Sequence, residues 1–328
     1  MILMARCFKC QDAAVVHVAY TKQDVCRSCF CSQFESRVRK ANYDFSLLLR
    51  SDVIAVGISG GKDSACLLYN LHLLSKEIGF QLTPILIDEG IAGYRNKAAA
   101  KAEELCEQLS LPLHTFSYKD SFGLSMDELM LKRNEKRKED ASFGRPSCGY
   151  CGVFRKNSLN KAARELGCSK LAIGHNADDV AQTFLMNLLR GEKSGNERFG
   201  VAVDAGIAGF VPRIKPLIYN LELECAQYAL LKELPFHLGE CPYSNEAYRG
   251  VVKDFLNDAE EKYPGTKFNL LSSFLSLHKK LSGKAVEEEK AHVATVACPT
   301  CGESYSGSNA TCKACSFVKE FSQSAARN

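Results

Sequence analysis

The chain has 328 residues and a net charge of +4 at pH 7, and 46% of its residues are hydrophobic. These values are typical of a globular protein with about two domains, and so mild a charge does not by itself indicate a nucleic-acid partner. No apolar run approaches the length of a membrane span, and the opening MILMARCFKC lacks the core of a signal peptide, so we expect a cytoplasmic protein with no membrane partner. The exceptional feature is sixteen cysteines, because closely spaced cysteines in a reducing compartment favour metal sites over disulfides.

The first predicted unit, residues 1–40, carries two CxxC pairs. Cys7 and Cys10 are followed, after fifteen residues, by Cys26 and Cys29. This spacing is typical of a structural zinc site in which four thiolates form a tetrahedral shell. Cys31 is a spare thiol that could replace Cys29. A unit of this size cannot build a core alone, so we expect a bound Zn²⁺ to supply much of its folding free energy.

The second predicted unit, residues 41–245, alternates apolar runs with helical patterns. The predicted strands are Val53–Ile58, Leu82–Ile87, Leu113–Ser117 and Lys170–Ile173. The helices predicted between them are Asp63–Gly79, Tyr94–Leu109 and Cys151–Gly167. Strands that alternate with helices of this length are typical of an α/β fold with a doubly wound parallel sheet.

A glycine-rich loop, VGISGGKDS at residues 56–64, joins the first of these strands to its helix. It departs from a Walker A loop, because Val56 stands where the first glycine is required and Asp63 follows Lys62 in place of serine or threonine. The loop still suits an anion, since glycines admit a close backbone approach and a helix N-terminus supplies N–H groups. The alternative is a glycine turn with a solvated lysine. The residues expected to bind phosphate are Ser59, Gly60, Gly61, Lys62, Asp63 and Ser64.

Three further cysteines form a second kind of site. Cys148 and Cys151 are a CxxC pair at a helix start, which places both thiols on one side of a turn, and Cys241 follows much later. Three thiolates leave a tetrahedral zinc one ligand short, or an iron–sulfur cluster with one iron lacking a protein ligand. A persulfide relay and a pair of inert buried thiols are also open. A thioredoxin-like pair is disfavoured, because the pair does not follow the first strand of a βαβ unit.

Helical patterns from Leu221 to Leu281 and the charged segment GKAVEEEKAH (283–292) predict that residues 246–290 are a helical extension with a linker. The last predicted unit, residues 291–328, repeats the zinc pattern with a ten-residue gap. Its ligands would be Cys298, Cys301, Cys312 and Cys315. We expect loss of this second Zn²⁺ to leave the three central cysteines unaffected, because they lie in another domain. Four cysteines in apolar helical patterns are predicted to be buried small residues: Cys66, Cys106, Cys168 and Cys225.

Five motifs, taken together and in order, indicate a family. They are SGGKDS (59–64), DEGIAGYR (88–95), CGYCGVFRK (148–156), GHNADDVAQTFLMNLLRGE (174–192) and ECPYSNEAYRG (240–250). The strand, loop and helix resemble the PP-loop of the N-type ATP pyrophosphatases. The whole set resembles the cytoplasmic tRNA 2-thiolation protein 1 family, its archaeal counterparts and the related tRNA thiouridine synthetases. The resemblance extends over nearly the whole chain, terminal cysteine units included.

The resemblance implies a tRNA uridine 2-sulfurtransferase. In this family ATP, with Mg²⁺, adenylates the C2 oxygen of the wobble uridine at tRNA position 34, and sulfur then displaces AMP to give 2-thiouridine. Cys148, Cys151 and Cys241 match the cysteines that hold a [4Fe–4S] cluster through three irons, so that the fourth iron can carry the sulfur.

Two more residues match positions that the family associates with catalysis. Arg155 is expected to face phosphate or a developing oxyanion, although a charged helix surface is the alternative. Asp179 is expected to position the substrate or transfer a proton, although it could instead lie in the first turn of a helix that Asn176 caps. The other residues assigned to the ATP site are Asp88, Gly174 and His175.

The family also implies partners. These are tRNA, a ubiquitin-related sulfur-carrier protein, and either a second copy of the chain or the tRNA 2-thiolation protein 2 partner. Basic residues at 132–138 and 37–40 become candidate phosphate contacts in this context, whereas a solvated helix face is their default interpretation. Competing hypotheses are thiolation at another tRNA position, an amide-forming PP-loop ligase, and a non-catalytic zinc-containing tRNA-binding subunit.

Overall fold

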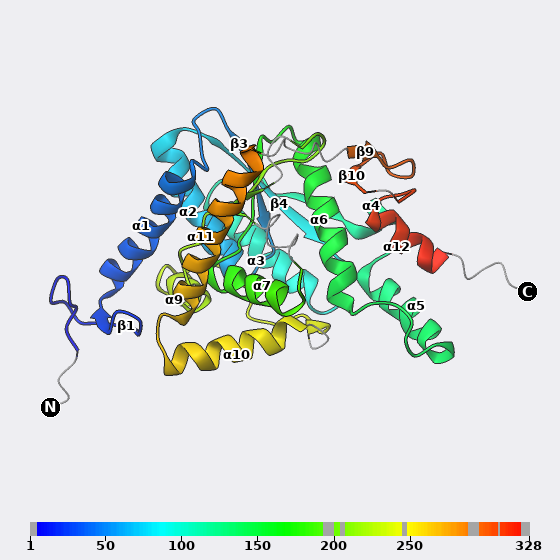
Figure 1. The fold of residues 1–328 in the computed structure, drawn as a ribbon. Coiled ribbons are helices and arrows are strands. Elements are labelled where there is room, and N and C mark those ends of the chain that lie inside the picture. Colours follow the sequence, from blue (N-terminus) through cyan, green and yellow to red (C-terminus); the bar gives the residue numbers. More distant parts are fainter. Residues whose placement is uncertain are drawn as a thin grey trace, which may run out of the picture.

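The computed structural model describes residues 5–192, 200–203, 207–244, 248–287, 295–307 and 309–322. At the centre of this described part lies a six-stranded sheet in the order β5-β4-β3-β6-β8-β7 (Figure 1). Neighbouring strands are parallel from β5 to β8, and β7 runs antiparallel at the edge. The strands are β3 (Val53–Ile58), β4 (Gln81–Asp88), β5 (His114–Ser117), β6 (Lys170–Ala172), β7 (Ala202–Val203) and β8 (Arg213–Ile214).

Helices cover both faces of the sheet, which confirms the predicted doubly wound α/β fold. In β3, Ile54 and Val56 join the core formed with α2 and α9, whereas Ala55 joins the core formed with α5 and α6. The helices are α1 (Arg27–Phe45), α2 (Lys62–Ile78), α3 (Arg95–Gln108), α4 (Tyr118–Phe122), α5 (Met126–Glu139), α6 (Ser147–Glu165), α7 (Ala177–Leu189), α9 (Glu222–Leu231), α10 (Tyr248–Lys262) and α11 (Thr266–Glu287).

The predicted elements agree closely with these bounds, with two differences. Strand β3 has the predicted limits, but α6 begins at Ser147 and not at Cys151, which places both cysteines of the CxxC pair near the start of the helix. Helix α11 continues to Glu287, into the segment 283–292 that we read as a linker, and residues 288–294 lie outside those described.

The two terminal units are small β-hairpins joined to helices, and they lie at opposite ends of the molecule (Figure 1). The first consists of β1 (Val16–Val18) and β2 (Gln23–Val25) and leads into α1. The second consists of β9 (Thr295–Ala297), β10 (Ser304–Ser306) and α12 (Lys313–Ser322). In each unit four cysteine sulfurs lie within 4.8 Å of one another, which confirms the two predicted four-cysteine groups. These are Cys7, Cys10, Cys26 and Cys29, and Cys298, Cys301, Cys312 and Cys315.

The other predicted cysteine environments are also confirmed. Cys31 is buried outside the first group, so Cys29 is the cysteine placed with the other three. The four cysteines predicted to be small core residues are all buried: Cys66, Cys106, Cys168 and Cys225.

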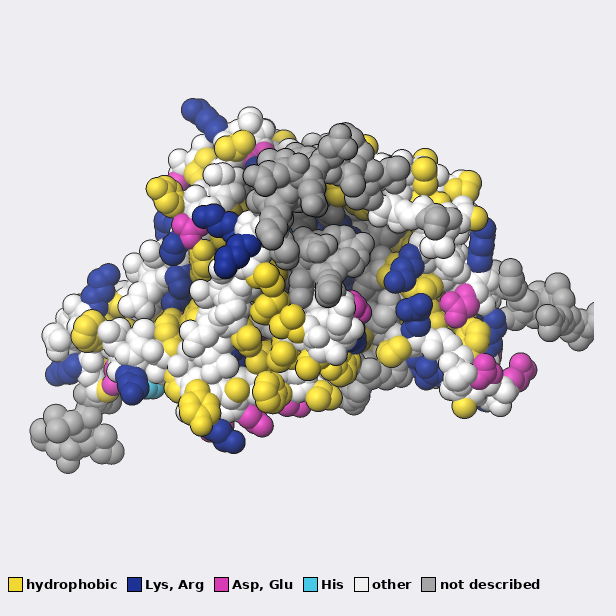
Figure 2. Space-filling model, in the orientation of Figure 1, with side chains coloured by type: hydrophobic (Ala, Val, Ile, Leu, Met, Phe, Trp, Pro, Cys, Tyr) yellow, Lys and Arg dark blue, Asp and Glu magenta, His cyan; other side chains and the backbone are white. Residues whose placement is uncertain are grey.

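Over the described residues, every helix is too short or too polar to cross a membrane. One face carries a group of hydrophobic side chains in its lower middle, over α10 and the end of α7 (Figure 2). The exposed large hydrophobic residues of these two helices include Leu188 and Leu189 on α7, and Val251 and Phe255 on α10. We call these four residues the apolar patch.

Candidate active site

The loop between β3 and α2 depends on a glycine. Gly60 has a φ of +80°, and a Cβ at this position would overlap the carbonyl oxygen of Ala98 on α3. The Ser64 hydroxyl closes the loop from inside, because it donates to the carbonyl of Gly61 at 2.9 Å and accepts from the N–H of Ser59 at 3.1 Å. No side chain caps α2 at Gly61, so its first N–H groups are available to an anion.

Two residues distant in sequence hold the same loop from outside. Arg95 Nη1 donates to the carbonyl of Ser59 at 2.9 Å, and the backbone N–H of His237 donates to the carbonyl of Gly60 at 2.8 Å. Gly174 packs against the start of α2, where a Cβ would lie 3.3 Å from the backbone of Asp63. The loop is therefore held by hydrogen bonds from inside and outside and is not a solvated turn. Its N–H groups suit the predicted phosphate site, and we call it the phosphate loop after that prediction.

We expect Gly60→Ala to weaken ATP binding at least tenfold. An alanine held at positive φ costs about 1 kcal/mol or more, and the overlap with Ala98 forces the loop to move. Gly61→Ala is the matched comparison, because φ there is −89° and the nearest atom to an added Cβ is 3.4 Å away. Calorimetric titration with ATP checks the prediction, and equal affinities for the two variants would contradict it.

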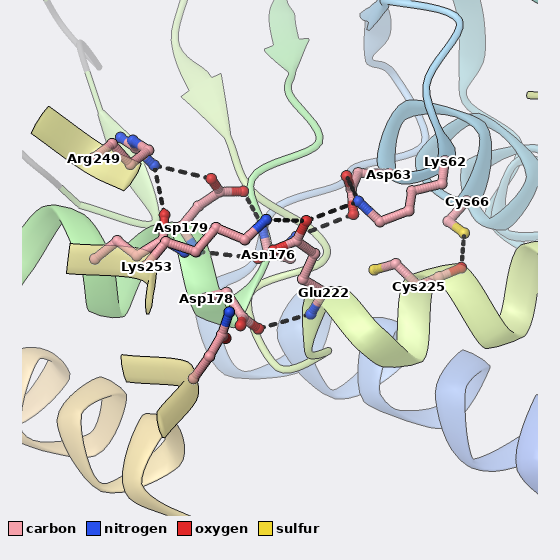
Figure 3. A network of polar contacts seen from close by, with 12 residues as sticks. Lys62, Asp63, Cys66, Asn176, Asp178, Asp179, Glu222, Cys225, Arg249 and Lys253 are labelled. Carbon is pink, nitrogen blue, oxygen red and sulfur yellow. Dashed lines mark hydrogen bonds and ion pairs between the residues drawn. The ribbon is translucent and has the colours of Figure 1, made fainter. Parts of the chain in front are cut away.

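Lys62 begins α2 and lies within a network of charges (Figure 3). Its Nζ is 3.1 Å from Asp63 Oδ2 and 3.0 Å from Glu222 Oε1, and the same Glu222 oxygen is 2.9 Å from Lys253 Nζ. Burial opposes the charge on Lys62, but the two carboxylates outweigh it and raise the pKa of the ammonium group. The lysine is therefore a fixed cation at the start of α2.

Asp179 has a structural role at the start of α7. Asn176 Oδ1 accepts from the N–H of Asp179 at 3.0 Å, and Asp179 Oδ2 accepts from the N–H of Asn176 at 3.2 Å. This reciprocal pair confirms the capping interpretation. Arg249 of α10 lies 3.0 Å from Asp179 Oδ1, and Asn176 Nδ2 donates to Asp63 Oδ1 at 3.0 Å, so the cap connects α10 to α2. A catalytic role for Asp179 remains a prediction.

A cavity of about 470 Å³ lies between the loop and α6. Its polar lining comes from the loop, from α6, from the segments after β4 and β6, from the start of α3 and from β8: Ser59, Asp63, Ser64, Glu89, Arg95, Arg155, Lys156, His175 and Arg213. Gly174 also lines the cavity, together with apolar side chains of the sheet that would suit an adenine ring. Asp88 accepts the N–H of Gly90 at 2.8 Å, and the neighbouring Glu89 lines the cavity. Contact of Asp88 with ATP stays a prediction.

Glu89 connects two arginines across this cavity. Glu89 Oε1 is 2.9 Å from Arg155 Nη2, and Glu89 Oε2 is 3.2 Å from Arg95 Nε, while the carboxylate itself is buried. The chain Arg95–Glu89–Arg155 therefore joins the phosphate loop to α6. The link that Glu89 forms between the two arginines was not predicted from the sequence. The motif DEG after a strand resembles a solvated loop, and nothing in the pattern indicates that the glutamate is buried.

His175 lies on the cavity wall with its Nδ1 buried and without a hydrogen-bond partner. Burial, assisted by the positive charges of Lys215, Arg249 and Arg213, lowers the pKa of His175 to about 3. The imidazole is therefore neutral at physiological pH, so it forms part of the wall and does not counter phosphate charge.

This neutral histidine makes the fold sensitive to acid. Between pH 6.5 and about 3 the unfolded chain binds a proton at His175 that the folded chain does not, so stability falls as the pH falls. From pH 7 to pH 5 we expect this residue to lower the free energy of unfolding by about 2 kcal/mol. Urea titrations at pH 7 and pH 5 should show that the free energy of unfolding falls less in His175→Gln than in wild type, by that amount. The exposed His17→Gln is the control and should behave as wild type does. Equal losses in wild type and His175→Gln would contradict the buried neutral state.

The three central cysteines come together beside the cavity. Cys148 Sγ lies 3.9 Å from the carbonyl of Tyr243, two residues after Cys241. Burial raises the pKa of Cys241, and the nearby thiols of Cys151 and Cys148 add to the effect. Arg155 Nη2 is 3.3 Å from Cys151 Sγ. One α6 arginine thus contacts both the cysteine site and, through Glu89, the phosphate side of the cavity.

The spacing of these thiols differs from that of a zinc site. A tetrahedral zinc with Zn–S bonds of about 2.3 Å holds its sulfurs about 3.8 Å apart. Among the residues that the structure describes, sets of three or more possible ligands within 4.8 Å of one another occur only in the terminal units. The sulfurs of Cys148, Cys151 and Cys241 are therefore not all within 4.8 Å of one another, so their spacing in this conformation is wider than that of the two terminal groups.

Six of the candidate tRNA-contact residues have intramolecular partners. Each of the N-terminal cations pairs with a carboxylate: Arg37 with Glu224, Arg39 with Glu77 and Lys40 with Asp44. On α5, three cations donate to backbone carbonyls: Arg133 to Arg145, Lys136 to Glu320 and Arg137 to Phe143. These bonds give the cations a structural role, and contact with tRNA remains a prediction.

The parallel sheet, the loop after its first central strand and the adjoining cavity define a PP-loop protein. The family model described as the PP-loop domain matches residues 30–260. The chain is 37% identical to the tRNA 2-thiolation protein NcsA of Haloferax volcanii, over 95% of this chain and 98% of that protein. It is 35% identical to the cytoplasmic tRNA 2-thiolation protein 1 of Saccharomyces cerevisiae, over 92% of this chain and 82% of the relative. The chain belongs to this tRNA 2-thiolation protein family, which confirms the resemblance found in the sequence.

A solved structure agrees with this assignment. The U34-tRNA thiolase NcsA from Methanococcus maripaludis, solved with its [4Fe-4S] cluster, superposes with a TM-score of 0.73 at 32% identity. The match covers 85% of this chain and 89% of that one. The names of the relatives also agree with the cytoplasmic location predicted from the sequence.

Proposed function

We propose that the chain is an ATP-dependent tRNA uridine 2-sulfurtransferase that acts on the wobble uridine. The observation that carries the proposal is the single cavity between the phosphate loop and α6. Ser59 and Asp63 line it on one side and Arg155 on the other, and Arg155 Nη2 is 3.3 Å from Cys151 Sγ. A uridine activated at the loop would therefore lie beside the cysteines. The likeness to a U34-tRNA thiolase supports the choice of base.

The proposed first step is adenylation. The C2 oxygen of uridine attacks the α-phosphorus of ATP, the bond from that phosphorus to the bridging oxygen breaks, and pyrophosphate leaves. The free N–H groups at the start of α2 and the Lys62 ammonium would hold the pyrophosphate. Asp63, which lines the cavity, would meet the Mg²⁺ that accompanies ATP. In the second step sulfur attacks C2, and AMP leaves with the original oxygen.

The three central cysteines fit a [4Fe–4S] cluster with three protein ligands. Their donors are all thiols, Cys151 and Cys148 lie near enough to Cys241 to raise its pKa, and the three sulfurs are spaced more widely than those of the terminal groups. Such a cluster, when bound, supplies an iron without a protein ligand at which sulfur can be held. Arg155 faces this site and would stabilise negative charge on Cys151 and on the oxygen that departs with AMP. Tyr118, buried beneath them, donates its hydroxyl to the carbonyl of Cys151 at 2.9 Å and fixes that turn.

The remaining parts of the proposal concern metals, domains and partners. We assign one Zn²⁺ to each terminal four-cysteine group and keep the division into units 1–40, 41–245, 246–290 and 291–328. Sulfur would come from a ubiquitin-related carrier protein.

The apolar patch on α7 and α10 supports pairing with a second copy or with a tRNA 2-thiolation protein 2 partner, because exposed patches of this kind mark protein interfaces.

Nucleoside analysis tests the function directly. Mass spectrometry of tRNA from cells lacking the protein, resolved by tRNA position, should show loss of 2-thiouridine at position 34. Restoration by the wild-type gene, and not by a Lys62→Ala variant, is the control. Loss of a thiolated base at another position, with position 34 intact, would exclude the wobble assignment.

A further inference from the structure

The CxxC turn is held on its outer side by α12 of the C-terminal unit. Tyr150, the residue between Gly149 and Cys151, is fully buried. Its ring meets Phe317 edge-on, with 4.8 Å between ring centroids, and Phe321 in the same manner at 5.4 Å. Its hydroxyl donates to Glu320 Oε1 at 3.2 Å. Three residues of α12 therefore hold one residue of the turn that presents the cysteines.

The same helix also holds the segment that leads into this turn. The Tyr150 hydroxyl accepts from the N–H of Arg145 at 3.1 Å, and the Arg145 guanidinium lies 5.6 Å from the ring centroid of Phe317. Lys136 of α5 donates to the carbonyl of Glu320 and lies between the rings of Phe143 and Phe321. Figure 1 shows α12 lying beside α6 and α5.

The position of α12 depends in turn on the four-cysteine group. Cys312 directly precedes the helix, Cys315 lies in its first turn, and Cys298 Sγ accepts the N–H of Cys312 at 3.4 Å. The large apolar residues of α12 contribute to the core of the central domain and not to a core of their own. A unit of this size needs its metal to fix its shape, so the metal sets where α12 begins.

We infer that the C-terminal four-cysteine module is a positioning element for the central cysteine site. Its metal fixes α12, and α12, through Phe317 and Glu320, fixes Tyr150 and with it the thiols of Cys148 and Cys151. The inference rests on the proposed metal sites, and it replaces the expectation that the central cysteines are independent of the C-terminal zinc. The N-terminal module lies at the opposite end of the molecule and joins the core with α1, α2 and α9, so it has no such effect (Figure 1).

The two modules provide a matched pair of variants. Cys301→Ser and Cys10→Ser, each purified without oxygen, should both lose about one zinc per chain, because a four-thiolate site rarely keeps its metal with three ligands. Cys301→Ser should also lose more than half of its iron and of its visible cluster absorption, whereas Cys10→Ser should keep both. Equal iron in the two variants, with the zinc lost from each, overturns the inference.

Substitutions on α12 test the contact itself with all zinc ligands present. Phe317→Ala and Glu320→Gln should keep both zinc ions but exchange the backbone hydrogens of residues 145–151 at least tenfold faster than wild type, and they should lower the iron content. Lys319→Ala, an exposed change on the same helix, should match wild type, and Phe317→Leu should restore part of the protection. Unchanged exchange over residues 145–151 in both Phe317→Ala and Glu320→Gln overturns the inference.

The exchange measurement distinguishes the positioning role of α12 from the proposed cluster. Iron-free wild-type protein would refute the proposed cluster, but faster exchange of residues 145–151 in the α12 variants would still establish the positioning role. Iron in wild type, together with unchanged exchange and unchanged iron in the variants, would leave the proposed function intact and refute the inference alone.

Discussion

Lys62→Ala is expected to abolish tRNA-dependent pyrophosphate release, with a loss of at least a thousandfold, and to leave tRNA binding within about twofold of wild type. The ammonium group is held at the start of α2, where the loop has been shaped for phosphate, and it is the loop's only lysine. Removing a fixed charge that stabilises a reacting phosphate lowers the reaction rate by about two to three orders of magnitude in comparable sites. Here the loss of ATP affinity would lower the rate further.

The measurement is pyrophosphate release in the presence of ATP and tRNA, paired with a tRNA binding titration. Lys253→Ala is the matched control, because its Nζ contacts the same Glu222 oxygen from α10 without being part of the loop. It should lower the rate less than tenfold. Normal pyrophosphate release by Lys62→Ala would remove the phosphate-binding assignment of the loop.

Serine substitution of any one of Cys148, Cys151 and Cys241 is expected to remove most of the iron and the thiolation activity together. Wild-type protein prepared without oxygen should be brown and contain about four irons per chain. The three changes should be equivalent, because each removes a ligand of the same group. Adenylation should persist in all three variants, since the proposed ATP site is the loop on the other side of the cavity.

The rival mechanisms predict different patterns for the same three variants. A persulfide relay predicts no iron, one cysteine whose loss blocks sulfur transfer, and a partner whose loss still allows a single turnover. A zinc site predicts colourless protein with a third zinc. Active, iron-free protein prepared without oxygen would exclude the cluster and favour the relay.

Sequence reasoning succeeded where a short segment determines its own structure. The run VIAVGI is apolar throughout and is followed by SGG, so the limits of β3 could be predicted directly from the sequence. Asn176 and Asp179 have the spacing of a reciprocal cap, and the four-cysteine groups have the spacing of zinc sites. In each case the partners are close in sequence, and few alternative arrangements exist.

Sequence reasoning failed where the residues that interact come from segments distant in the sequence. The start of α6 was placed too late, because Pro146, Gly149 and Gly152 weaken the helical pattern that tertiary packing then imposes. Glu89 could not be recognised as the link between Arg95 and Arg155, since burial of a charged side chain depends on partners brought by the fold.

The position of α12 is a second such case. Phe317 and Phe321 are four residues apart and so form one apolar helix face, which indicates that something covers it. Nothing in their spacing names Tyr150 as the residue they cover. The dependence of one metal site on the other was therefore invisible in the sequence and appears only in the contacts between α12 and α6.

The way the phosphate loop is held also has a consequence for the order in which the protein matures on the ribosome. Ser59 and Gly60 receive hydrogen bonds from Arg95 and from the backbone of His237, a residue made long after the loop itself. A nascent chain that ends before residue 237 has the loop's glycines and lysine but lacks one of the bonds that fix their shape. The full set of hydrogen bonds that shapes the loop is therefore completed late in synthesis, when the second half of the sheet and its following segment have emerged, and truncated translation products lack the finished loop.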